Sequence, residues 1–217
     1  QAELDSAAFA CEVHQRGRST VAAGRFHSLW LDRDGKLRGC GSGDFEGCSG
    51  DDQDESGEYY PSEELEEFCA GGKSTPDACR FVGHLGYGGL EADGPQSPVI
   101  VLMPPPPVVV AELATGPLHS LALDAGGNAW SWGWGGNGRL GHGDCVHLAT
   151  PKRISSARGG TALPKVQQVS CGSEHSLLLS CDGELLAFGR GLSGRLGLGN
   201  AMEDGEEWSP SMKVRYV

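Results

Sequence analysis

Three histidines recur in one local setting, and imidazole is both a common metal ligand and an acid–base group near neutral pH. His27, His119 and His175 each stand three residues after a glycine and directly before Ser-Leu. Three imidazoles that converged on one point would make a metal centre. The same position in three repeated units places them one per unit instead. We therefore expect each histidine to make a structural hydrogen bond within its own unit.

Two glycine-rich segments, 133–138 and 189–194, fit the dinucleotide pattern G-x-G-x-x-G. That pattern binds a pyrophosphate at the start of a helix, whereas the Arg-Leu-Gly-x-Gly that follows here does not continue as one. The segment 71–74, Gly-Gly-Lys-Ser, lacks the earlier glycine of a phosphate loop, because Glu67 stands there. No nucleophile, base and orienting group recur at a fixed spacing, so we expect no catalytic residue and no cofactor.

The histidines belong to a threefold internal repeat. Segments 21–35, 113–127 and 169–183 share Gly-x-x-His-Ser-Leu-x-Leu and a glycine eight residues after the histidine. A further glycine follows six residues later, at Gly41, Gly133 and Gly189. Alternating polar and apolar residues on both sides of an Asp-Gly-like turn predict a β-hairpin. Small sheets repeated in this way bury their faces against neighbouring sheets, which favours a blade-like architecture.

The first copy carries an insertion. Gly41 lies 42 residues before Gly83, where the corresponding glycines of the other two copies are 5 apart, so the inserted length is 37. We place the insertion at about residues 44–82.

Most of the negative charge lies in this insertion. The formal net charge is −12, and eleven acidic residues with no Lys or Arg fall between Asp44 and Glu67. The rest of the chain is nearly neutral and has no basic stripe for phosphates, so we expect no nucleic acid partner. The run is either a solvated loop or a docking strip for a basic partner. The candidate docking residues are Asp51, Asp52, Asp54, Glu55, Glu63, Glu64, Glu66 and Glu67.

The composition indicates an all-β protein that does not cross a membrane. Glycine supplies 35 of 217 residues, which argues against a helical bundle. The longest uncharged apolar stretch, 99–111, is interrupted by Pro104–Pro107 and is shorter than the roughly 20 residues that a spanning helix needs. The prolines suit a stiff connector between units, with a ligand for a proline-binding domain as the alternative.

The cysteines indicate where the protein resides. The eight cysteines include no C-x-x-C pair, the chain has no Asn-x-Ser/Thr site, and its first residues lack a basic signal region. We therefore expect reduced thiols in an intracellular protein, with no compartment singled out. A zinc site from Cys40, Cys48, Cys69 and Cys79 would have an unusual ligand spacing, so we expect no bound metal.

The tryptophans divide between packing and contact roles. Trp130 and Trp132 alternate on one strand face, and we expect them to fill a seam between sheets. Trp134 follows a glycine on the loop side, and this position is equally consistent with contact with a partner and with packing. The positions that we assign to the repeat framework are Gly24, His27, Gly116, His119, Trp132, Gly172 and His175.

The pattern Gly-x-x-His-Ser-Leu-x-Leu, turn Gly, aromatic-Gly, Gly-Arg-Leu-Gly-x-Gly resembles the regulator of chromosome condensation repeat. The resemblance covers 21–214 outside the insertion and implies a β-propeller, with about three blades and a partial ring in this chain. The predicted domains are a tail of an earlier blade (1–20), blade 1 with the insertion (21–107), blade 2 (108–165), and blade 3 with the start of a next blade near Pro210 (166–217). Three blades do not close a ring, which needs at least four.

The resemblance also implies classes of function. Family members include exchange factors for Ran-type GTPases, a plant UV-B photoreceptor, domains of ubiquitin ligases and scaffolds. The photoreceptor absorbs through tryptophans directly after the repeat glycine, where this chain has Arg25, Pro117 and Ser173. We expect a non-catalytic protein-interaction scaffold whose ring is completed by missing sequence or another chain. Its expected partners are a small GTPase or subunits of a large complex, and guanine-nucleotide exchange is the alternative function.

Overall fold

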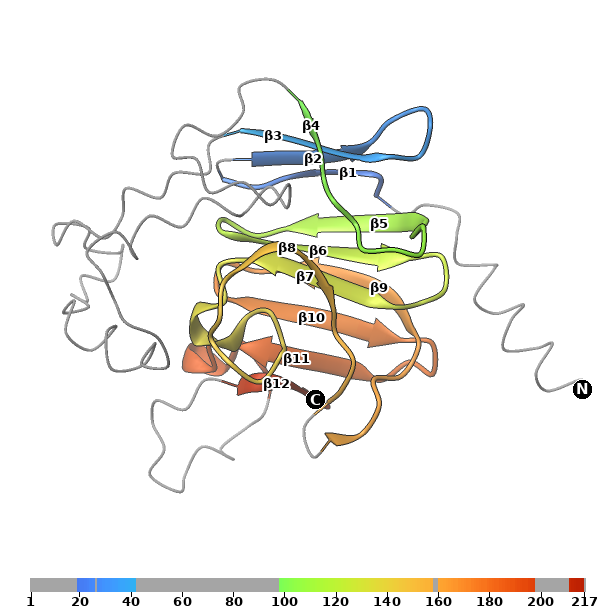
Figure 1. Ribbon diagram of the computed structural model, residues 1–217. Coiled ribbons are helices and arrows are strands. Elements are labelled where there is room, and N and C mark those ends of the chain that lie inside the picture. Colours follow the sequence, from blue (N-terminus) through green and yellow to red (C-terminus); the bar gives the residue numbers. More distant parts are fainter. Residues whose placement is uncertain (1–18, 26, 42–97, 158–159, 198–210, 217) are drawn as a thin grey trace, which may run out of the picture.

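The chain folds into three four-stranded antiparallel sheets. The computed structural model describes residues 19–25, 27–41, 98–157, 160–197 and 211–216 (Figure 1). Blade 1 comprises β1 (Val21–Ala23), β2 (His27–Leu31), β3 (Leu37–Gly41) and β4 (Val99–Ile100). Blade 2 comprises β5 (Val110–Thr115), β6 (His119–Asp124), β7 (Ala129–Gly133) and β8 (Leu148–Arg153). Blade 3 comprises β9 (Val166–Cys171), β10 (His175–Ser180), β11 (Leu185–Gly189) and β12 (Ser211–Tyr216).

The three blades share one hydrogen-bonding register, which confirms the predicted repeat. The histidine that opens the second strand pairs with the glycine that closes the third: His27 with Gly41, His119 with Gly133 and His175 with Gly189. The glycine loops of blades 2 and 3 form only short 3-10 turns, η2 (Gly136–Gly138) and η4 (Leu192–Gly194). As predicted, neither glycine-rich segment opens an α-helix.

The closing glycine is required by both conformation and space. Gly133 has φ of 104°, a backbone region that other residues rarely adopt. A Cβ at this position would lie 2.6 Å from the carbonyl oxygen of Leu118 and 2.8 Å from the Cα of His119. The third strand therefore passes directly over the backbone of the histidine turn, and only glycine fits there.

Each blade has two different faces, because side chains alternate along a strand. The His face carries the histidine and the second and fourth residues after it, which in blade 2 are Leu121 and Leu123. The Ser face carries the following serine and the second residue after it, which in blade 2 are Ser120 and Ala122.

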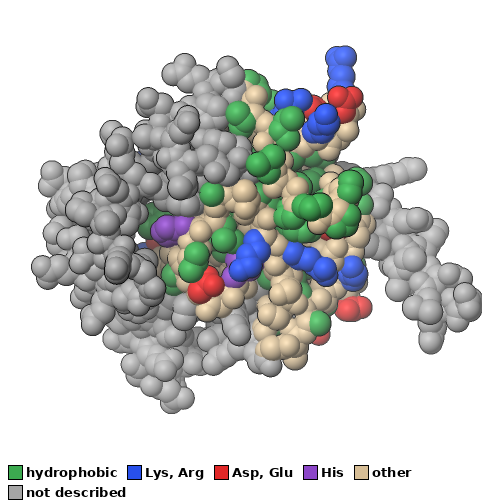
Figure 2. Space-filling view, in the orientation of Figure 1, with side chains coloured by type: hydrophobic (Ala, Val, Ile, Leu, Met, Phe, Trp, Pro, Cys, Tyr) green, Lys and Arg blue, Asp and Glu red, His purple; other side chains and the backbone are tan. Residues whose placement is uncertain are grey.

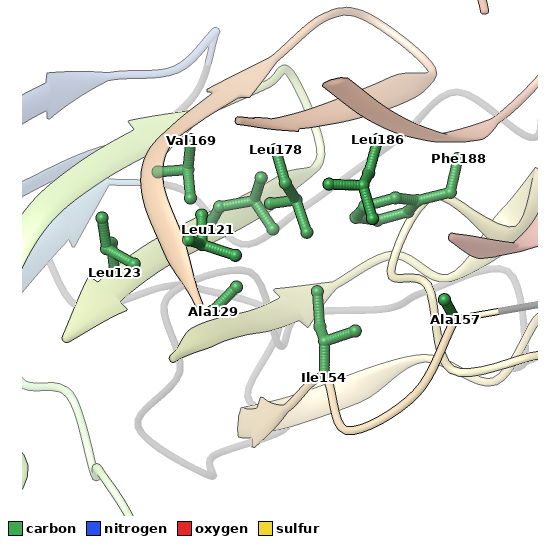
Figure 3. Packing of buried hydrophobic residues seen from close by; sticks show 10 residues of the cluster. Leu121, Leu123, Ala129, Ile154, Ala157, Val169, Leu178, Leu186 and Phe188 are labelled. Atoms are coloured by element: carbon green, nitrogen blue, oxygen red, sulfur yellow. The ribbon is translucent and has the colours of Figure 1, made fainter. Parts of the chain in front are cut away.

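The core lies in the seams where a His face packs on the next Ser face. Leu29 of blade 1 packs with Trp130 and Trp132 of blade 2, which confirms that these tryptophans fill a seam. In the second seam, Leu121 and Leu123 pack with residues of blade 3 that include Leu178 and Phe188 (Figure 3). The same apolar seam is built twice, and in Figure 1 the sheets lie one above another from blade 1 to blade 3.

Two predicted segments, the acidic insertion and residues 211–216, can be placed relative to the observed strands. β3 ends at Gly41 and β4 begins at Val99, so the acidic insertion falls between two neighbouring strands of blade 1, and its candidate docking residues lie outside the described residues. Residues 211–216, expected to open a next blade, instead pair with β11 as the fourth strand of blade 3. In every blade the third strand pairs with a segment that follows it in the chain, and this segment forms the fourth strand.

Candidate functional site

The repeat histidines bridge the blades. His27 Nε2 lies 2.8 Å from Ser120 Oγ, and His119 Nε2 lies 2.9 Å from Ser176 Oγ. The expectation of a bond within each unit was therefore wrong, because the ring projects from the His face into the seam. His27 and His119 each meet the serine that follows the histidine of the next blade.

The direction of the seam hydrogen bond follows from the proton on the serine. Ser176 Oγ donates to the carbonyl oxygen of Arg139 at 2.9 Å, so its single proton is used. His119 Nε2–H must then be the donor to Ser176. For His27, burial lowers the pKa to about 4, so this ring is neutral near pH 7. These imidazoles hold blades together and are poorly placed for acid–base chemistry.

The repeat glycines pack against these rings. A Cβ on Gly116 would lie 2.6 Å from the carbonyl oxygen of Gly172 and 2.6 Å from Cε1 of His119. A Cβ on Gly24 would meet Gly116 and His27 in the same way, at 2.7 Å. The spacing Gly-x-x-His is thus a packing requirement, since the imidazole lies on its own glycine while the next blade approaches from the other side.

An open groove of about 290 Å³ runs along this row of glycine turns. Its lining comes from one turn of each blade: residues 23–25, 115–117 and 171–173. Arg25, Pro117 and Ser173, the residues after the repeat glycines, therefore share one surface. Among these lining residues Arg25 is the one with a formal charge, so the groove holds no pair of groups for acid–base catalysis.

A second group of side chains, which we call the loop cluster, gathers where the glycine loops of blades 2 and 3 meet. Its members are Trp134, Arg139, His147, Glu174, Arg190 and Arg195. The guanidinium carbon of Arg139 lies 5.1 Å from the centre of the Trp134 ring, a cation–π contact. His147 meets the same indole edge-on, with ring centres 6.0 Å apart. The predicted contact residue Trp134 is thus partly buried and held in place by two neighbours.

Arg139 connects blade 2 to blade 3. Its side chain is 3% exposed, its Nε donates to the carbonyl oxygen of Gly136 at 2.8 Å, and one terminal nitrogen donates to that of Ser173 at 3.1 Å. Burial lowers the pKa of Arg139 to about 10, against the opposing effect of Glu174, so the guanidinium stays charged at neutral pH. This arginine stabilises the seam at its loop end while it supports Trp134.

Glu174 is the shared anion of the loop cluster. Its carboxylate oxygens lie 3.0 Å from Arg190, 2.8 Å from Arg195 and 4.0 Å from Arg139. Three arginines of two glycine loops thus converge on one carboxylate. Our sequence prediction missed Glu174 and the arginines, although the repeated Gly-Arg-Leu-Gly places Arg139 and Arg195 at one repeat position.

His147 shows how closely the loop cluster is packed. Its Nδ1 accepts a hydrogen bond from the backbone N–H of Gly135 at 3.0 Å, so Nδ1 carries no proton. Burial, aided by the charge of Arg139, lowers the pKa of His147 to about 4. The ring is therefore a neutral side wall for Trp134 near pH 7.

Exposed apolar side chains gather on the connection between blades 1 and 2. Ile100, Leu102 and Val109 are 43%, 53% and 69% exposed, and they flank the run Pro104–Pro107. Figure 2 shows hydrophobic side chains grouped beside Lys and Arg side chains on one face of the molecule. Residues 101–109 form neither strand nor helix, as expected for a connector between units.

The described parts of the chain contain no group of three or more His, Cys, Asp or Glu side chains that could hold a metal ion. They also contain no helix that could span a bilayer.

The repeat architecture matches a known family. Residues 126–179 match one model of the regulator of chromosome condensation (RCC1) repeat, and a second model of that description matches residues 19–46, 110–139 and 166–195. Together the matches cover more than half of the chain. Each of the three short matches begins near the first strand of a blade and ends in or after its closing glycine, so the family repeat and the observed blade coincide.

Individual relatives share parts of this region. Residues of the human E3 ubiquitin-protein ligase HERC2 are 48% identical over 86 positions, which is 40% of this chain and 2% of that protein. The Protein RCC2 homolog of Xenopus laevis is 40% identical over 95 residues, 43% of this chain and 18% of that protein. The ultraviolet-B receptor UVR8 of Arabidopsis thaliana is 35% identical over 119 residues, which is 54% of this chain and 26% of that protein. The matched region is thus a small part of each relative.

Solved structures share the fold at low sequence identity. Prp20p from Saccharomyces cerevisiae has a TM-score of 0.63 and 20% identity, over 93% of this chain and 38% of that one. Human WBSCR16 has a TM-score of 0.59 and 21% identity, over 92% and 37%. With the repeat register, the seam histidines and the closing glycines in place, the chain belongs to the regulator of chromosome condensation (RCC1) repeat family and forms three blades of its β-propeller.

Proposed function

We propose that the chain acts as a non-catalytic protein-interaction scaffold, with the loop cluster as its contact surface. The observation that carries this proposal is Trp134, a partly exposed indole held over the buried guanidinium of Arg139 at 5.1 Å. Tryptophan and arginine are enriched among the residues that dominate binding energy at protein interfaces. A side chain fixed before binding also loses little conformational entropy when a partner arrives.

The surroundings of Trp134 favour a protein partner over a small molecule. Val146, in the same glycine loop, is 58% exposed, and the polar side chains of Glu174, Arg190 and Arg195 lie in the adjoining loop cluster. An exposed apolar residue beside an indole and a charged, polar rim suits a partner surface with an apolar centre and a polar edge.

The acidic insertion is a second proposed contact, for a partner with a basic surface. Its eleven carboxylates between Asp44 and Glu67 carry nearly all of the net charge of −12. Deletion of residues 44–82 would abolish recovery of such a partner from native extract and leave the blades folded. Unchanged recovery would remove the insertion from the proposal.

A photo-crosslinking experiment tests the loop cluster. A benzoylphenylalanine at Val146 should capture a partner in native extract, and the added change Trp134→Ala should reduce that capture at least tenfold. The same photoreactive residue at Leu102, 53% exposed on the β4–β5 connection, is the matched control. Equal capture from both positions, or capture unaffected by Trp134→Ala, would contradict the contact role of the cluster.

Guanine-nucleotide exchange is the second candidate function. The structural report on Prp20p describes its binding to Gsp1p and histones, and this chain resembles Prp20p in fold. Accelerated release of a fluorescent guanine nucleotide from a Ran-like GTPase would support exchange. Unchanged release across a panel of related GTPases, with a folded sample, would leave the scaffold as the function.

A further inference from the structure

Blade 2 carries its fourth strand, β8, at its outer edge. Its first strand, β5, contacts the first strands of both neighbouring blades, β1 and β9, and β8 lies at the opposite edge of the same sheet. Blade 2 has a neighbour on each of its two faces, so this edge is not a face left open at the end of the stack. It belongs to the rim that the blades present together.

Two cations end β8 at this rim. Lys152 and Arg153 are both exposed, and neither forms an ion pair with a carboxylate within the described residues. Arg38 and the three arginines of the loop cluster, by contrast, each have a carboxylate partner. The charges of Lys152 and Arg153 are therefore available to an acidic surface of another molecule.

An exposed serine follows these cations. The hydroxyl of Ser155 forms no hydrogen bond within the described residues, whereas Ser131 and Ser176 use theirs in buried bonds. Its oxygen is thus accessible to a reagent without the loss of a structural contact.

The backbone around Ser155 is extended and fixed. Ile154 N–H donates to the carbonyl oxygen of Ala129 at 2.9 Å, which continues the pairing of β8 with β7, and the carbonyl oxygen of Ser155 accepts from Leu163 N–H at 3.2 Å. Side chains alternate along an extended chain, so Arg153 and Ser155 are exposed while Ile154, 1% exposed, packs in the core. The cations and the hydroxyl therefore lie on one accessible stretch of chain.

We propose that Ser155 is a phosphorylation site for a protein kinase with an acidic substrate cleft. Such a cleft selects its substrates by charge, and cations two and three residues before the acceptor, here Arg153 and Lys152, match it. The γ-phosphoryl group of a nucleoside triphosphate passes to Ser155 Oγ. A new O–P bond forms, and the bond from the γ-phosphorus to the bridging oxygen breaks. The hydroxyl proton goes to a base of the kinase, and the nucleoside diphosphate leaves.

Phosphorylation would change the charge of the rim and leave the loop cluster untouched. A phosphoserine carries a charge of about −1.5 to −2 near pH 7, enough to offset Lys152 and Arg153. β8 begins at Leu148, next to His147 of the loop cluster, and its six residues span about 20 Å. Ser155 lies beyond the far end of β8, so this proposal is independent of the contact role of Trp134.

Phosphorylation of the folded full chain by the catalytic subunit of cAMP-dependent protein kinase, with Mg²⁺ and ATP, tests the proposal. Tandem mass spectrometry locates the phosphate and should find it on Ser155. Ser155→Ala should remove this phosphopeptide, and Ser170→Ala, at an exposed serine without preceding cations, should retain it. The double change Lys152→Ala and Arg153→Ala should lower kcat/KM for phosphorylation of Ser155 at least tenfold.

A second pair of exposed cations supplies the matched control. Arg33→Ala with Lys36→Ala, in the β2–β3 turn, should leave the rate at Ser155 unchanged. Ser19, which follows Arg16 and Arg18, is a competing acceptor, but its hydroxyl already donates to the carbonyl oxygen of Val21.

Three results would overturn the proposal. The first is phosphate on Ser19 and none on Ser155 in the folded chain. The second is a rate at Ser155 that the loss of Lys152 and Arg153 does not change. The third is phosphate on Ser155 only after heat denaturation, since the acceptor would then be hidden in the fold. Circular dichroism confirms that each variant is folded before the kinase is added.

Discussion

His27 and Ser120 are 93 residues apart in the chain, yet the ring Nε2 of one lies 2.8 Å from the hydroxyl oxygen of the other. His119 and Ser176 are separated by only 57 residues and make the same contact at 2.9 Å. The difference in separation reflects the insertion in blade 1. The geometry of the seam is therefore independent of how much chain connects two strands within a blade.

Loss of a seam serine should destabilise the fold. Ser176→Ala leaves His119 Nε2–H without its acceptor and the carbonyl oxygen of Arg139 without its donor, in a fully buried site. We expect the free energy of unfolding to fall by about 2 kcal/mol, the usual cost of a buried unsatisfied polar group. Denaturant titration measures the change, and Ser170→Ala, at an exposed serine of β9, should leave it unaltered.

The repeat glycines should be more sensitive than other glycines. Gly116→Ala places a methyl group 2.6 Å from the carbonyl oxygen of Gly172, so the seam must open or the imidazole must move. We expect a loss of about 1–3 kcal/mol, as for other overpacked cores. Gly126→Ala, where the nearest atoms are side-chain atoms 3.2 Å away, should cost much less in the same denaturant titration. Equal effects would contradict the packing role of the repeat glycine.

Stability should fall as the pH drops from about 6.5 to about 4. The pKa of His27 is lowered to about 4 in the fold, so across this window the unfolded chain binds a proton that the folded chain does not. The contribution of His27 is fully present above the unfolded pKa and decreases by about 2 kcal/mol between pH 7 and pH 5. Unfolding titrations at the two pH values measure this slope. His27→Gln should reduce it, and an identical slope would contradict the buried neutral imidazole.

Replacement of Trp132 should mainly reduce stability, whereas replacement of Trp134 should mainly reduce partner binding. Trp132→Ala empties a site that is 0% exposed and should lower the free energy of unfolding by about 3–5 kcal/mol. Trp134→Ala should cost clearly less stability, because its ring is partly exposed, while it reduces partner capture. Thermal unfolding of both variants makes the comparison, and a larger loss at Trp134 would show that its role is packing.

The shared carboxylate of the loop cluster should matter most at low salt. Glu174→Gln retains a similar shape but removes the negative charge that Arg139, Arg190 and Arg195 share. We expect a loss of about 1–2 kcal/mol that decreases at high ionic strength. Asp182→Asn, at an exposed turn residue, serves as control. A loss that does not depend on salt would indicate a packing defect instead.

The blades were predictable because their signals are local. The turn glycine, the closing glycine and the alternation around His119 all lie within one hairpin, so spacing alone gives the strands and their register. The seam partner of that histidine was not predictable in the same way. Ser176 belongs to another unit, and a repeat shows where a residue recurs without showing which neighbour it faces.

The loop cluster was predictable only in part. Trp134 stood out because it follows a closing glycine, and its place on the loop side was expected. The convergence of Arg139, Arg190 and Arg195 on Glu174 depends on how far blade 3 is rotated against blade 2, which single-strand patterns do not encode. The role of residues 211–216 was also missed, since their partner β11 lies across a glycine loop.

The hydrogen bond between histidine and serine is the same in both seams, so it does not determine which blade packs against which. The order of the blades must then come from side chains that differ between the seams, such as Trp132 in the first seam and Phe188 in the second. Exchanging these two aromatic residues would leave the hydrogen-bonded frame intact and alter which blades fit together. Each seam thus combines a His–Ser hydrogen bond that both seams share with aromatic packing that differs between them. The aromatic packing can be redesigned without changing the hydrogen bond.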